Sequence, residues 1–137
     1  MKIIHCADIH ADSAMKGHFS KLASQRREEI VDAFGRMVDF AQKNGVSAII
    51  ISGDLFDTGK NQHKTLKNRL FYIISNHPQI DFLYLRGNHD EAFNIEETYP
   101  NLKLFSKDGW TSYSYGQVEI SGREFGASIP ASAYSQL

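Results

Sequence analysis

The chain has 137 residues, a length typical of one domain and sufficient to bury a hydrophobic core. Its composition, 42% hydrophobic and 23% charged, excludes a disordered or low-complexity chain. The net charge of -1 provides no overall field for nucleic acid, so a polyanion would have to be held by local basic groups or by metal.

Cysteine content and hydropathy indicate the cellular compartment in which the protein is expected. Cys6 is the only cysteine, so no disulfide can form within the chain, which suits a reducing cytoplasm. The apolar stretch near the start is too short for a signal peptide, and no window approaches the roughly 20 apolar residues of a membrane span. We therefore expect a cytoplasmic protein with no membrane partner.

Apolar runs and amphipathic segments alternate along the first two thirds of the chain. Residues 2–7, 48–52 and 82–85 are typical of buried strands. Residues 24–44 and a segment around 66–74 carry apolar side chains at three- and four-residue spacing, which predicts helices. This order predicts right-handed βαβ units and a parallel sheet between helices.

Beyond Pro100 the pattern changes to short strand-like runs between glycines and polar turns. These runs are 102–105, 110–115, 117–120 and 124–127. Residues 130–137 show no helical period and close no obvious element. We therefore expect residues 1–137 to form a single, truncated α/β domain.

Polar residues follow each of the three predicted parallel strands. Asp8 and His10 follow the first, Asp54 the second, and Asn88 and His89 the third. Ligands bind beyond the carboxyl ends of strands in such sheets, so these residues should meet at one edge. One cluster alone would be explained by turns or helix caps, but three at successive strand ends favour a metal site.

These residues offer carboxylate oxygen, amide oxygen and imidazole nitrogen, a mixture that divalent Mn, Fe and Zn accept. If the first strand continues through Asp8 and His10, their side chains point to the same face and can bind the same ion. Asp54 could bridge that ion and a second one, to which Asn88 would add its amide oxygen. Two ions about 3.5–4 Å apart can clamp a phosphate and lower the pKa of a water towards ~7.

His89 is placed to stabilise charge on the phosphate or to protonate the leaving oxygen. Asp90 or Asp57 could fix the tautomer of His89. Asp12 and Asp57 are otherwise expected to order the loops or to support the ligands.

Other polar and aromatic residues have ordinary explanations. His5, on the first strand, is expected in the core or behind a ligand. Trp110, Tyr113 and Tyr115 are expected to pack on a sheet rather than to form a platform for stacked bases. Six helix and loop cations could touch a DNA backbone, but solvated helix faces are the default. These cations are Arg26, Arg27, Lys60, Lys64, Lys67 and Arg69.

Three motifs resemble, in order and separation, the first blocks of the calcineurin-like metallophosphoesterase superfamily. They are Asp8-Ile9-His10, Gly53-Asp54-Leu55-Phe56-Asp57 and Gly87-Asn88-His89-Asp90. Within it, residues 7–13 and 51–57 are most similar to the SbcD-type DNA repair exonucleases, including YhaO-like bacterial proteins, and the resemblance covers about residues 1–128.

The resemblance implies the N-terminal half of an α/β sandwich, with a mostly parallel sheet flanked by helices and followed by short strands. It also implies two divalent ions, with manganese expected and iron, zinc or magnesium as alternatives. The implied reaction is phosphodiester hydrolysis of DNA, and the implied partner is an SbcC-like ATPase.

The superfamily pattern continues with further metal-binding histidines, whereas no histidine follows His89 here. We therefore expect a weak second metal position, low activity, and a homo-oligomer that covers the exposed sheet. Two alternatives stay open. One is a small-molecule phosphodiesterase or phosphatase of the same superfamily, and the other is an inactive, oligomerising fragment.

Overall fold

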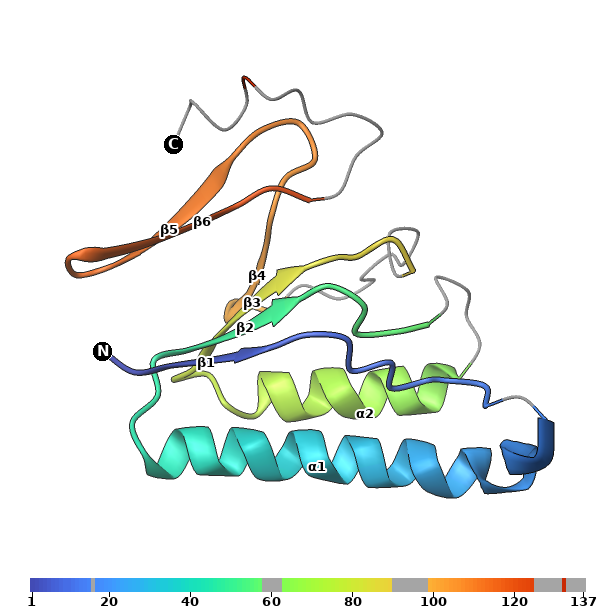
Figure 1. The fold of residues 1–137 in the computed structure, drawn as a ribbon. Coiled ribbons are helices and arrows are strands. Elements are labelled where there is room, and N and C mark those ends of the chain that lie inside the picture. Colours follow the sequence, from blue (N-terminus) through green and yellow to red (C-terminus); the bar gives the residue numbers. More distant parts are fainter. Residues whose placement is uncertain (16, 58–62, 90–98, 125–131, 133–137) are drawn as a thin grey trace.

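The computed structural model describes residues 1–15, 17–57, 63–89, 99–124 and 132. Four parallel strands form one sheet in the order β1-β2-β3-β4 (Figure 1). They are β1 (Ile3–Cys6), β2 (Ala48–Ser52), β3 (Asp81–Leu85) and β4 (Leu102–Leu104). The predicted parallel sheet is confirmed, and β2 has the bounds that its Ile-rich run predicts.

Both long helices, α1 (Ala23–Lys43) and α2 (Lys64–Ser75), lie on one face of the sheet (Figure 1). A short 3-10 helix, η1 (Gly17–Leu22), leads into α1. The apolar stripes of both helices pack against β2 and β3 and close the larger core. Its helical side chains include Val31, Phe34, Val38, Ala41, Leu66, Leu70 and Ile74. No helix in the described ranges has the length and apolarity to cross a membrane.

The other face of the sheet carries an antiparallel hairpin, where the sequence pattern predicts a sheet between helices. The hairpin consists of β5 (Thr111–Tyr115) and β6 (Val118–Gly122). The strand order explains the difference. The crossovers from β1 to β2 and from β2 to β3 proceed in the same direction. Because crossovers between parallel strands share one hand, both place their helices on one face.

A second, smaller core lies between this hairpin and the sheet. Phe105 is buried there, and its ring meets that of Tyr113 edge-on with centroids 5.4 Å apart. The Tyr115 hydroxyl donates a hydrogen bond of 2.8 Å to Asp81 at the start of β3. The prediction that Tyr113 and Tyr115 pack on a sheet is confirmed. Of the strand expected at 124–127, only Glu124 lies within the described residues.

Candidate metal centre

The loops after β1 and β2 run side by side and are joined by backbone hydrogen bonds. The amides of Asp8 and His10 donate to the carbonyls of Gly53 and Asp54, at 3.2 and 3.0 Å. The predicted reason for the pairing of Asp8 with His10 is wrong, because β1 ends at Cys6 and does not continue through them.

Left-handed backbone conformations bring the side chains together instead. Asp8, His10 and Asp54 have φ values of 53°, 47° and 49°. Such conformations cost about 1–3 kcal/mol per non-glycine residue and gather at functional sites, where the surrounding structure enforces them. Met15 and His63 also have positive φ, so what marks the candidate site is that three such residues carry side chains that meet.

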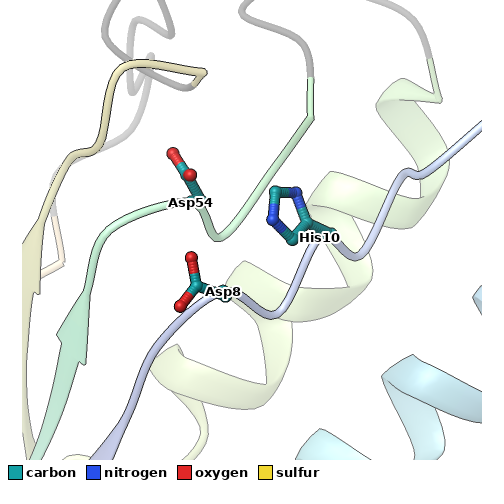
Figure 2. Close-up of side chains that lie close together, drawn as sticks. All are labelled: Asp8, His10 and Asp54. Atoms are coloured by element: carbon teal, nitrogen blue, oxygen red, sulfur yellow. The ribbon is translucent and has the colours of Figure 1, made fainter.

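Asp8, His10 and Asp54 each offer a ligand atom within 4.8 Å of the others. Figure 2 shows the two carboxylates and the imidazole facing a common space. Asp8 is exposed and the other two are half-buried, so the space is open to solvent. Two carboxylates and one imidazole fit a divalent ion such as Mn, Fe or Zn.

The His10 ring is oriented by Asp57, which lies in the loop after β2. A carboxylate at this position can only accept a hydrogen bond from Nδ1 of His10, which leaves Nε2 free to bind a metal. Asp57 is held in turn, because its amide donates to Oδ1 of Asp12 at 2.5 Å. Asp57 therefore contacts His10. The sequence analysis left Asp57 and Asp90 as alternative partners of His89 and otherwise expected Asp57 to order the loops or to support the ligands.

The third loop, after β3, brings His89 to the same place. The His89 amide donates to Oδ1 of Asp54 at 3.2 Å, and its ring lies edge-on to His10 with centroids 5.7 Å apart. Asn88 and His89 are both exposed at this edge. Asp90, predicted to assist catalysis, lies outside the described residues.

Gly87 permits this close approach. A Cβ atom at that position would lie 2.2 Å from Oδ1 of Asp54 and 2.8 Å from its amide nitrogen. Any side chain at residue 87 would therefore displace the carboxylate of Asp54 or separate the two loops. The role of Gly87 thus includes direct contact with a candidate ligand.

Two supporting ion pairs were not predicted from the sequence. Arg86 donates two hydrogen bonds of 2.7 Å to the carboxylate of Glu124, which is 1% exposed. Lys67, expected on a solvated face, is 2% exposed and lies 3.4 Å from Asp12. Helical spacing could have revealed Lys67, because it shares a face with buried Leu70 and Ile74.

The structure places three other residues singled out in the sequence. His5 is exposed and lies outside the core, with Nε2 2.9 Å from the Ser52 hydroxyl. Arg26 and Arg69 do lie on exposed helix faces, where they pair with neighbouring glutamates. Lys60 lies outside the described residues.

The model of the calcineurin-like phosphoesterase family matches residues 1–131. The chain belongs to this family. It is 30% identical over 115 residues to the DNA double-strand break repair protein Mre11 of Aeropyrum pernix, a match covering 83% of this chain and 27% of that protein. It is 31% identical over 100 residues to the SbcD component of nuclease SbcCD from Escherichia coli K12, covering 72% of this chain and 23% of that protein.

A solved structure supports the fold of this calcineurin-like phosphoesterase chain. The nuclease MPE of Pseudomonas putida aligns with a TM-score of 0.55 at 14% identity, over 84% of this chain and 50% of that one. The chain thus spans about a quarter of the length of the curated relatives. The likeness to MPE shows a shared fold, and the match over residues 1–131 shows the family.

Proposed function

We propose that this chain is the metal-binding part of a divalent-metal-dependent phosphodiesterase that acts on DNA. The observation that carries the proposal is the convergence of Asp8, His10 and Asp54 at the carboxyl edge of a parallel sheet. The names of the relatives, a DNA double-strand break repair protein and a nuclease, support DNA as the substrate. Exonuclease action, as in the SbcD-type enzymes, is the finer form of this proposal.

Two metal positions follow from the donor set. Asp8, His10 and Asp54 would hold the first ion, with manganese proposed and Fe, Zn or Mg as alternatives. Asp54 and Asn88 would hold the second. Since no histidine follows His89, the second position has only these two ligands from this chain and should bind more weakly.

The bound ions and the residues of this chain would have different roles in hydrolysis of the phosphate ester. Divalent ions bound here would polarise the phosphate and lower the pKa of a water towards ~7. His89, next to Asp54, would stabilise charge on the phosphate or donate a proton to the leaving oxygen. Asp57 holds His10, so Asp90 is the proposed partner of His89.

The experiment is a manganese titration by calorimetry on this chain, with the mass read by light scattering. We expect one dominant site per chain, lost in Asp54→Ala and retained in Asp108→Ala, a matched change at an exposed position between β4 and β5. A folded chain that binds no manganese would overturn the proposal. A mass above one chain would support the proposed homo-oligomer, and a monomer would count against it.

Hydrolysis then separates the substrate classes. We expect slow, manganese-dependent turnover of bis-p-nitrophenyl phosphate, abolished by Asp54→Ala. End-labelled DNA should be cleaved in preference to nucleotides. Any longer product of the same gene should be tested in the same assay. An SbcC-like ATPase is the proposed partner of that longer protein. Preference for nucleotides would instead favour a small-molecule phosphodiesterase.

A further inference from the structure

We propose that the buried Lys67–Asp12 pair is a positioning device for His10, acting through Asp57. The inference rests on the proposed metal-binding function and adds residues that make no contact with the metal position themselves. It joins α2, the loop after β1 and the loop after β2 into one chain of contacts.

The first link is an ion pair removed from water. Nζ of Lys67 lies 3.4 Å from Oδ2 of Asp12, and their side chains are 3% and 0% exposed. The same Nζ lies 4.9 Å from the ring centroid of Phe56. Removing two charges from water is costly, and apolar residues of similar volume often give equal or greater stability. Stability alone is therefore a poor reason for a lysine on the buried face of α2.

The second link runs from Asp12 to Asp57. Oδ2 of Asp12 faces Lys67, while Oδ1 accepts the amide of Asp57 at 2.5 Å. Both oxygens of one buried carboxylate are thus committed, which fixes the backbone of residue 57 relative to α2. A fixed backbone limits where the Asp57 carboxylate can lie.

The third link reaches the candidate ligand. Oδ1 of Asp57 accepts a hydrogen bond from Nδ1 of His10. This contact selects the tautomer with its proton on Nδ1, which leaves Nε2 unprotonated and able to bind a metal beside Asp8 and Asp54. The prediction is that loosening the buried pair releases the ring of His10 while the fold stays intact.

A double variant separates this role from stability. Lys67→Met with Asp12→Leu replaces the pair by apolar side chains of similar size and leaves no unpaired buried charge. The double variant should stay folded but with a lower melting temperature, because the Asp57 amide loses its acceptor. We expect it to bind manganese about 10- to 100-fold more weakly, the range found when groups that orient metal ligands are altered. Arg69→Met, on the exposed face of the same helix, is the control and should bind manganese normally.

Nitrogen-15 NMR of the imidazoles adds a readout that needs no metal. Wild-type His10 should show a proton on Nδ1, and the double variant a mixture of tautomers. A proton on Nε2 in the wild type, or a folded double variant with unchanged tautomer and unchanged manganese affinity, would overturn the proposal.

The two proposals can fail separately. If the wild type binds no manganese, the proposed function fails, whereas the tautomer of His10 still tests the positioning role. If manganese binds and the double variant behaves like Arg69→Met, only the positioning role fails.

Discussion

Replacing Glu124 by glutamine should lower the free energy of unfolding by about 3 kcal/mol. The carboxylate is 1% exposed and accepts two hydrogen bonds from Arg86, whose side chain is 19% exposed. Each buried hydrogen bond to a charged group is worth about 1.5–3 kcal/mol. The glutamine side chain has the shape of glutamate but only one acceptor oxygen, whereas Arg86 donates to two oxygens of Glu124. The guanidinium of Arg86 would regain only part of its hydration. For a chain of this size the melting temperature should fall by about 10 °C.

Urea denaturation followed by circular dichroism measures this loss. Glu119→Gln, a matched change at an exposed position of β6, should stay within about 0.5 kcal/mol of wild type. The double variant Arg86→Met with Glu124→Leu should recover most of the stability, because it leaves neither charge buried alone. If Glu124→Gln were as stable as Glu119→Gln, the pair would contribute nothing and the reasoning would be refuted.

Three further predictions follow from single contacts. Gly87→Ala should abolish manganese binding measured by calorimetry, because its Cβ would lie 2.2 Å from Oδ1 of Asp54. Asn101→Ala should lower the stability to urea by about 2–3 kcal/mol, because its buried amide donates to three carbonyls that follow or end α2. Burial raises the pKa of the Cys6 thiol to about 11. At about pH 8 its alkylation should therefore be roughly 100-fold slower than in urea, and stability should fall as pH rises from about 9 to 11. Fast labelling of folded protein would contradict this.

The strands and helices were predictable because their signals are local. The Ile-rich run at 48–52 becomes β2 without change, and the apolar spacing of α1 and α2 matches their buried faces. The packing of both helices on one face of the sheet could not be predicted from local sequence patterns. It depends on strand order, which arises from pairing between residues far apart in the chain.

The candidate ligands were predictable as residue types at strand ends, but their geometry was not. An extended strand through Asp8 and His10 was the simplest expectation, whereas the structure uses left-handed backbone at both positions. Propensity disfavours that conformation, and the backbone hydrogen bonds to the loop after β2 enforce it. Those backbone hydrogen bonds join residues more than 40 positions apart, so no local sequence pattern predicts them.

The candidate metal centre is supported from both faces of the sheet. On the helical face, Lys67 and Asp12 lie behind Asp57 and His10. On the hairpin face, Glu124 holds Arg86, the residue before the loop that carries Asn88 and His89. The first support acts on the orientation of one ligand, and the second on the attachment of a whole hairpin. Loss of the first should therefore lower metal affinity by more than its effect on stability explains, whereas loss of the second should change stability first. Measuring both quantities in both sets of variants tests whether the two layers act separately.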